Sequence, residues 1–177
     1  TIQEEILHNE EDACETYRQL LDIDASNSHA ALALERLLRK LGQFKELAIF
    51  YRQQVDYAPD DSIRVEYLHK LGLLLARDLH EIEEAVDVFG NALSIDANSV
   101  ACKRAVESML DDLPATDENA QVRNTMATML EPLYTESDWS KLARVLSVLI
   151  DTCDDPLGRV SLLMRLAALY EAHDSHL

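Results

Sequence analysis

Histidine side chains are the first candidates for chemistry in this sequence. Six histidines occur, and only His173 and His176 lie close together, three residues apart, as two metal ligands on one face of a helix would. This pair falls in the last residues of the sequence, where helices fray. We therefore predict no metal site and no cofactor.

Other reactive side chains lack the spacing that catalysis needs. Adjacent carboxylates such as Glu83-Glu84 begin predicted helices, where acidic side chains favour the helix dipole and stay solvated. There is no Gly-rich phosphate loop, no nucleophile elbow and no zinc-helix motif. The scattered Cys14, Cys102 and Cys153 are interpreted as small apolar residues in helix packing. We predict that the chain is not an enzyme.

The formal charge of −17 is unevenly distributed along the chain. Residues 1–27 carry eight acidic residues against one arginine, and residues 81–138 carry thirteen acidic against three basic residues. Residues 28–80 instead carry eight basic against seven acidic residues. The acidic balance disfavours phosphate contacts, so we predict no nucleic-acid partner. No apolar run reaches the roughly 20 residues of a membrane span, so we also predict no membrane contact.

The elements that would position binding residues are helices. Only 4 Gly and 4 Pro occur in 177 residues, and 47% of the residues are hydrophobic, which favours an all-α fold over one with many tight turns. The clearest unit spans residues 71–98. Its apolar residues recur at helical spacing in two successive helices, which are marked by Leu71-Gly72, Leu75, Ala85, Phe89 and Ala92-Leu93. The turn Asp96-Ala97-Asn98 ends the unit, and Ser99 can cap the next helix.

This unit resembles a tetratricopeptide repeat. The Leu71-Gly72 pair stands in the first helix of that pattern, and Ala85, Phe89 and Ala92 stand in the second. The final turn departs from the family, because Ala97 replaces its proline. The resemblance implies a right-handed superhelix of antiparallel helix pairs, in which stacking of the pairs provides the core.

Two internal offsets extend the repeat. Residues 12–26 match residues 84–98 in type at an offset of 72, and residues 30–80 align with residues 125–175 at an offset of 95. In the unit that spans residues 28–61, Glu35, Leu47 and Gln54 stand where the family prefers small residues. We therefore expect looser helix contacts in this unit. About nine helices are predicted, over residues 2–23, 28–41, 44–57, 62–79, 82–95, 99–112, 117–136, 138–152 and 155–173.

Two irregularities are expected within this series. The two offsets disagree about whether residues 117–136 form a first or a second helix of a pair, so a helix is gained or lost near residues 99–124. Pro132 should kink its helix, because proline removes a backbone donor and clashes with the preceding turn. No linker is recognised, and we predict a single repeat domain over residues 1–177, as a fragment of a larger protein.

Basic residues on predicted first helices are the candidate binding site. The resemblance implies that first helices line a concave groove that holds a peptide or helix of another protein. The known carboxylate-clamp arrangement is not matched, because Leu32 and Arg36 stand where its Lys and Asn would. We predict that the groove contacts an acidic or C-terminal segment through Arg36, Arg39, Lys40, His69, Lys70 and Arg77. Two alternatives stay open, a solvated basic face without a partner and acidic rims that recruit a basic partner.

The function predicted from the sequence is protein–protein interaction by a cytoplasmic scaffold. The alternative from another class is a regulatory or sensor module fused to an enzyme elsewhere in a longer chain.

Overall fold

The computed structural model describes residues 10–135 and 138–174, and 82% of these residues are helical, with no strand among them. The predicted all-α class is confirmed for this part of the chain. The chain divides into two compact units, residues 1–88 and 89–177. Each unit is described by itself below.

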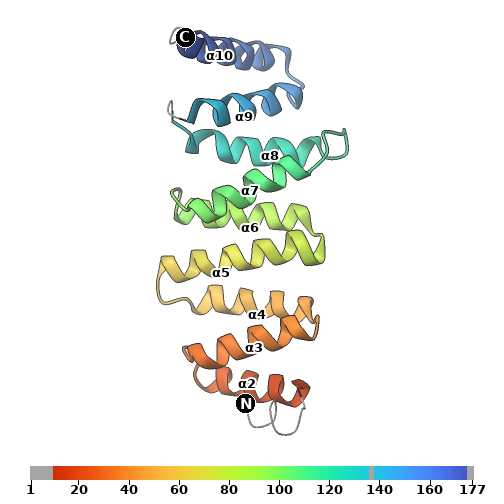
Figure 1. Cartoon of the computed structure of the whole chain (residues 1–177), viewed down its shortest axis with the longest axis vertical. Helices are drawn as coiled ribbons and strands as arrows, with labels where there is room; N and C mark the ends of the chain where they lie inside the picture. The colour runs from red at the N-terminus through yellow and green to blue at the C-terminus, as the bar shows by residue number, and fades with distance from the viewer. Residues whose placement is uncertain (1–9, 136–137, 175–177) are drawn as a thin grey trace. The chain divides into compact units, whose positions relative to one another are not determined.

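Unit 1 contains α2 (Glu10–Ile23), α3 (Ser28–Lys40), α4 (Phe44–Tyr57) and α5 (Asp61–Leu74), which continues as a π-helical turn, η1 (Leu75–Leu79). Consecutive helices pack on one another, α2 on α3, α3 on α4 and α4 on α5 (Figure 1). The helix α6 (Ile82–Ile95) begins in this unit and ends in the next.

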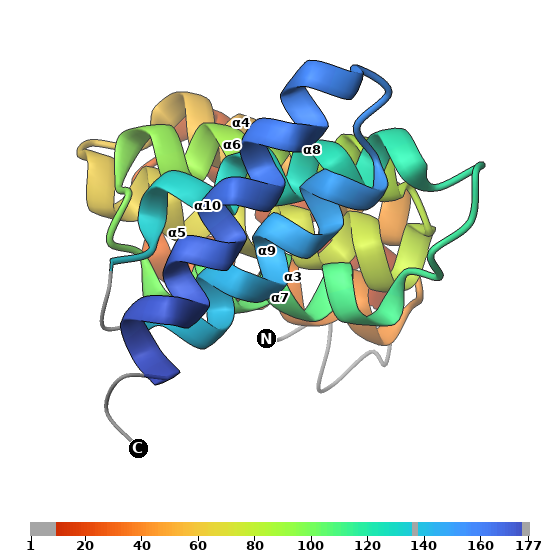
Figure 2. The ribbon, with the colours of Figure 1, turned by 90° about the horizontal axis from the view of Figure 1, so that it is seen from above.

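Unit 2 continues with α7 (Val100–Asp112), α8 (Ala120–Leu130), the 3₁₀ turn η2 (Glu131–Leu133), α9 (Trp139–Asp151) and α10 (Pro156–Asp174). Here too neighbours in sequence are neighbours in space, since α7 packs on α8, α8 on α9 and α9 on α10 (Figure 1, Figure 2). This neighbour-to-neighbour packing is the arrangement in which each helix pair depends on the next for its core.

The 72-residue offset is reproduced by helix boundaries and by turn chemistry. α2 and α3 occupy residues 10–23 and 28–40, and α6 and α7 occupy residues 82–95 and 100–112. In the first turn the carboxylate of Asp24 accepts a hydrogen bond from the amide of Ser26 at 3.1 Å. In the second turn Asp96 accepts one from the amide of Asn98 at 2.9 Å. These side chains stabilise the turn because they mimic a backbone turn.

Local caps explain where the helices begin. The side chain of Asn27 accepts a hydrogen bond from the amide of Ala30, and Asp60 accepts one from the amide of Ile63. Ser99 caps α7 in the same way, through the amide of Cys102 at 3.5 Å. Each cap satisfies a backbone donor that the first helical turn leaves without a partner. The predicted cap at Ser99 is therefore confirmed.

The 95-residue offset relates α4 and α5 to α9 and α10. α4 begins at Phe44, and α9 begins 95 residues later at Trp139. In the same way α5 begins at Asp61, and α10 begins 95 residues later at Pro156. Residues 113–119, within the stretch where a helix is expected to be gained or lost, form a connection without α-helix between α7 and α8.

The predicted kink at Pro132 is wrong. α8 ends at Leu130, and Pro132 lies in the 3₁₀ turn η2 that follows it. Because proline lacks the backbone donor that an α-helix needs, the α-helix ends before Pro132 instead of bending around it. The predicted helix over residues 117–136 is correspondingly shorter at both ends.

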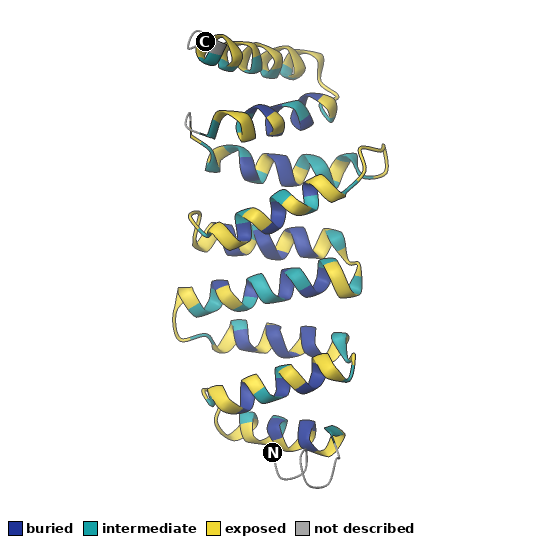
Figure 3. Cartoon of the chain, viewed as in Figure 1, coloured by how far each residue is buried: buried dark blue, intermediate teal, exposed yellow. Residues whose placement is uncertain are grey.

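The core of each unit is formed by apolar side chains at helical spacing. Figure 3 shows buried stretches along the helices of both units. Leu34, Leu47 and Tyr51 are almost completely buried in unit 1, and Met126 and Leu146 in unit 2. Leu47 is 0% exposed, so the looser packing expected from its size does not leave it open to solvent.

Gly42 ends α3 in a conformation that other residues adopt at a cost. Its φ is +67°, and its amide and that of Gln43 donate to the carbonyls of Arg39 and Leu38. We expect Gly42→Ala to lower the free energy of unfolding by about 1 kcal/mol, because alanine is strained at positive φ. A Cβ at this position would meet no atom within 4 Å, so a much larger loss in a urea titration would contradict this explanation.

Candidate protein-binding surface

The six candidate residues lie on two helices of unit 1 and on the π-helical turn. α3 carries Arg36, Arg39 and Lys40, α5 carries His69 and Lys70, and η1 carries Arg77. α3 and α5 are separated in sequence by α4, and side chains of both meet around Glu35, one turn before Arg39 on α3.

Glu35 is the centre of a polar cluster between these helices. One of its carboxylate oxygens lies 3.7 Å from Nε of Arg39, and the other accepts a hydrogen bond from Nζ of Lys70 at 3.3 Å. Lys70 also pairs with Glu66, one turn earlier on α5, at 3.0 Å. The side chains of Glu35 and Lys70 are only 18% and 25% exposed. The contact between Glu35 and Lys70 therefore joins α3 to α5 in a partly buried setting.

Two tyrosines complete this cluster. Tyr51 of α4 is 0% exposed, and its hydroxyl accepts a hydrogen bond from Arg39 at 3.0 Å. Tyr67 of α5 lies with its ring centroid 6.1 Å from that of Tyr51, and Nζ of Lys70 lies 5.1 Å from the Tyr67 centroid. A cation at this distance from an aromatic ring is attracted by it.

Burial and neighbouring charges shift the pKa values of Lys70, Arg39 and Tyr51 in this cluster. Burial opposes the charge of Lys70, but the carboxylates of Glu66 and Glu35 outweigh it and raise the pKa of the ammonium. Burial also opposes the charge of Arg39, while the hydrogen bond with Tyr51 and the nearby carboxylates raise its pKa. Burial, and then the charge of Glu35, raise the pKa of Tyr51, so the phenol stays protonated. The pKa values of Lys70, Arg39 and Tyr51 are all raised, away from neutral pH, so none of these three groups is poised to exchange a proton there.

The remaining candidates differ in their exposure and in the neighbours that surround them. Lys40 forms an ion pair with Glu10 of α2. His69 is half-buried, and this burial together with the charge of Arg77 lowers the pKa of its imidazole. Arg36 and Arg77 are exposed. The structure thus unites Arg39 and Lys70 around one glutamate, whereas Lys40 is held by α2.

A second cluster of the same kind occurs in unit 2. Glu107 of α7 accepts hydrogen bonds from the hydroxyl of Tyr134 at 2.6 Å and from Nζ of Lys141 of α9 at 2.8 Å. Its side chain is 18% exposed, and Arg144 of α9 donates to its backbone carbonyl at 3.2 Å. Partial burial opposes its charge, but the bonds from Lys141 and Tyr134 outweigh it and hold the pKa of Glu107 below its usual range.

Neither glutamate was recognised as a cluster centre from the sequence. Glu35 and Glu107 are related by the 72-residue offset, and each contacts a lysine two α-helices further along, Lys70 or Lys141. The signal that was present is the departure at Glu35 from the small residue that the repeat pattern prefers. Such a departure indicates a polar contact that the pattern does not require.

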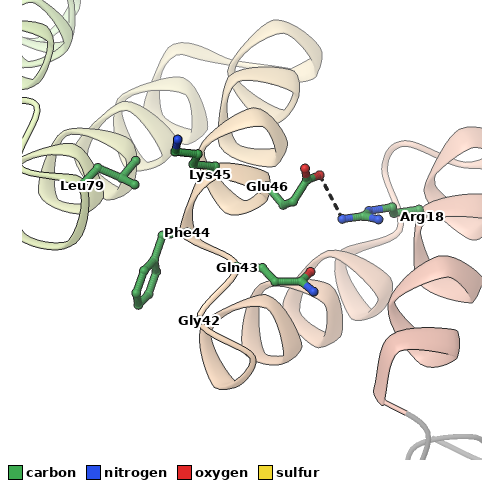
Figure 4. Close-up of a pocket in the computed structure, with 7 residues that line it drawn as sticks. All are labelled: Arg18, Gly42, Gln43, Phe44, Lys45, Glu46 and Leu79. Carbon is green, nitrogen blue, oxygen red and sulfur yellow. Dashed lines mark hydrogen bonds and ion pairs between the residues drawn. The ribbon is translucent and has the colours of Figure 1, made fainter.

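Unit 1 also has an open hollow beside the start of α4 (Figure 4). Its volume is about 690 Å³. Arg18 and Glu46, which lie in its wall, pair with each other at 3.2 Å. The other lining residues are Gly42, Gln43, Phe44, Lys45 and Leu79. None of the six candidate residues lines the hollow. A small-ligand site needs several polar groups that point at the ligand, and Arg18 and Glu46 of this hollow pair with each other instead.

In the described ranges no group of three or more His, Cys, Asp or Glu side chains could hold a metal ion. Of the His173 and His176 pair, His176 lies outside the described residues, and His173 stacks on Trp139 with ring centroids 4.9 Å apart. Among the helices that the structure describes, none is long and apolar enough to cross a membrane.

Comparison with known proteins adds no relative, because no protein-family model, no curated protein and no solved structure matches this chain.

Proposed function

We propose that the chain is a protein-binding scaffold of the tetratricopeptide-like class, and that its binding surface is formed by α3 and α5. The ligand is an extended peptide or a helix of another protein with an acidic segment. In this proposal the helix pairs stack as a right-handed superhelix and the first helices of the pairs face the ligand. No chemical step is assigned to the chain.

The contact between Glu35 of α3 and Lys70 of α5 is the observation that carries this proposal. It joins two helices that are not consecutive, so that side chains from both contribute to one surface. Next to Glu35 on α3 lie Leu32, which is 63% exposed, and the exposed Arg36. An exposed apolar side chain can bury apolar surface against a peptide, and the basic groups beside it can attract the acidic residues of that peptide.

The cluster assigns different tasks to the candidate bases. Arg39 and Lys70 already pair with Glu35, so an incoming carboxylate competes with this glutamate for them. Their main contribution is to hold α3 and α5 in register. Arg36 and Arg77 are exposed, and in this proposal they provide the charge that selects an acidic segment.

A peptide selection tests the proposal. Random peptides displayed on phage are selected against the chain, and the recovered peptides should be enriched in acidic residues. The double variant Arg36→Glu/Arg77→Glu should bind them at least about tenfold more weakly, because two attractive contacts become repulsive. Lys70 is left unchanged, because a glutamate there would face Glu35 and Glu66 and destabilise the fold.

The matched control reverses two exposed bases of unit 2, in the variant Arg104→Glu/Arg159→Glu, and should bind as the unaltered chain does. Selection of basic peptides, with binding lost in Glu83→Gln, would reject this surface in favour of the acidic rim. Failure to enrich any peptide would count against a peptide-binding scaffold altogether.

We also propose a cytoplasmic location. The three cysteines are free thiols, and Cys14 and Cys102 are buried. Unpaired cysteines are typical of proteins in reducing compartments, where disulfides are rare. A test is to locate the tagged chain by microscopy and fractionation, where recovery from an oxidising compartment would contradict this placement.

A further inference from the structure

The hollow beside the start of α4 combines apolar and basic side chains in its lining. Phe44 of α4 and Leu79 of η1 both line it and are only partly buried. Figure 4 shows these two side chains on the opposite side of the view from the ion pair of Arg18 with Glu46. The volume of about 690 Å³ lies within the range of binding pockets and is large enough for a bulky side chain.

Unit 2 shows how the equivalent of Phe44 is covered. At the 95-residue offset Phe44 corresponds to Trp139, and each of these residues begins its helix, α4 or α9. The Trp139 ring is stacked on the imidazole of His173 of α10, with centroids 4.9 Å apart and planes inclined by 18°. The aromatic residue at this position of unit 2 therefore has a planar ring as its neighbour.

Unit 1 has no second ring at this position. At the same offset His173 corresponds to Asp78, an exposed residue of the π-helical turn η1, and a carboxylate does not stack on a ring as an imidazole does. Within the described residues, Phe44 forms no ring contact. Phe44 therefore borders an open hollow where its equivalent in unit 2 borders a stacked ring.

The charges around the hollow favour an acidic ligand. Arg18 and Glu46 compensate each other at 3.2 Å, whereas Lys45 is exposed and forms no ion pair with a described residue. The lining therefore carries one uncompensated positive charge, although the chain as a whole has a formal charge of −17. A carboxylate close to the ring of a ligand is attracted by this charge.

We propose that the hollow binds an aromatic side chain of a partner protein that stands next to an acidic residue in the partner's sequence. The ring stacks on Phe44, as His173 stacks on Trp139, and the carboxylate pairs with Lys45. This inference is independent of the peptide-binding surface proposed for α3 and α5, because none of its six candidate residues lines the hollow.

Two tripeptide probes, acetyl-Glu-Trp-Glu-amide and acetyl-Glu-Leu-Glu-amide, test the ring contact. Each is titrated into the isotope-labelled chain, and NMR chemical shifts report both the affinity and the place of binding. The tryptophan peptide should shift the amide signals of Phe44, Lys45 and Leu79. It should bind about two- to tenfold more tightly than the leucine peptide, because stacking adds to the burial of apolar area. Absence of these shifts at about 5 mM tryptophan peptide would overturn the proposal.

Three variants locate the two contacts. Phe44→Leu keeps an apolar side chain and should bring the affinities for the two peptides within about a factor of two of each other. Lys45→Gln, at an exposed position, should weaken binding of both peptides about two- to fivefold. Tyr57→Leu is the matched control, because Tyr57 is an aromatic residue of the same helix that is 65% exposed and does not line the hollow. It should keep the preference for tryptophan, and circular dichroism of each variant checks the fold.

The remaining outcomes separate this site from other modes of binding. An unchanged preference for tryptophan in Phe44→Leu would overturn the stacking contact. Tighter binding of acetyl-Lys-Trp-Lys-amide than of the glutamate peptide would overturn the pairing with Lys45. Arg36→Glu changes the surface proposed for α3 and α5 and should bind the tryptophan peptide as the unaltered chain does. Loss of binding in Arg36→Glu would place the peptide on that surface, which would reject the hollow while supporting the proposed function.

Discussion

Replacing Phe89 by alanine is expected to lower the free energy of unfolding by about 3–5 kcal/mol. Phe89 was predicted from the repeat pattern to be buried, and its exposed fraction is 0%. The loss combines the transfer free energy of the ring with the cavity that the smaller side chain leaves. Urea unfolding followed by far-ultraviolet circular dichroism measures it.

Tyr57→Ala is the matched control for Phe89→Ala. Tyr57 is an aromatic residue on a helix of the same fold, but it is 65% exposed, so its removal should change the free energy of unfolding by about 0.5 kcal/mol or less. If Phe89→Ala and Tyr57→Ala had the same small effect, the repeat register that places Phe89 in the core would be contradicted.

The second large effect is expected at Glu107. We expect Glu107→Gln to lower the free energy of unfolding by about 1–3 kcal/mol at neutral pH, because the ionised carboxylate accepts bonds from Tyr134 and Lys141. The lower part of this range is favoured because the side chain of Lys141 is 49% exposed, and solvent screens its charge.

The pH dependence of this difference follows from the lowered pKa of Glu107. A carboxyl group whose pKa is lower in the folded state binds fewer protons there than in the unfolded chain, so folding is favoured where the group is ionised. The difference between the unaltered chain and Glu107→Gln should be constant above the ordinary glutamate pKa of 4.5. It should shrink as the pH falls from there through the folded value.

Urea titrations at a series of pH values check this dependence. Asp111→Asn is the control, because Asp111 is 57% exposed in its ion pair with Arg144 and an exposed pair contributes about 0–1 kcal/mol. A difference for Glu107→Gln that stays the same at acidic pH would show that the carboxylate charge does not stabilise the cluster.

The two glutamate clusters give the helices a contact that apolar packing cannot provide. An apolar face tolerates small shifts of one helix along another, whereas a partly buried ion pair is satisfied only in one register. Glu35 and Glu107 stand at equivalent positions of α3 and α7, and each contacts a lysine on α5 or α9. In the proposed scaffold, such contacts keep the binding residues of α3 and α5 at a constant spacing.

The sequence by itself determined the helices, their order and most of their bounds. This is possible because the signals are local: apolar residues at helical spacing, the cap at Ser99 and the turn residues after Asp24 and Asp96 act within a few residues of one another. The burial of Phe89 also followed from periodicity, because the repeat places it on the apolar face of α6.

Only the tertiary structure decided which polar side chains meet. Lys70 is 35 residues from Glu35, and Lys141 is 34 residues from Glu107, and no local pattern predicts a contact at that distance. From the sequence, Arg39 and Lys70 are predicted to contact a partner. In the structure both side chains contact Glu35, which stands where the repeat pattern prefers a small residue. The exposure of apolar residues on α10 likewise depends on what packs against that helix, and helix periodicity alone predicts an apolar face without predicting whether another helix covers it.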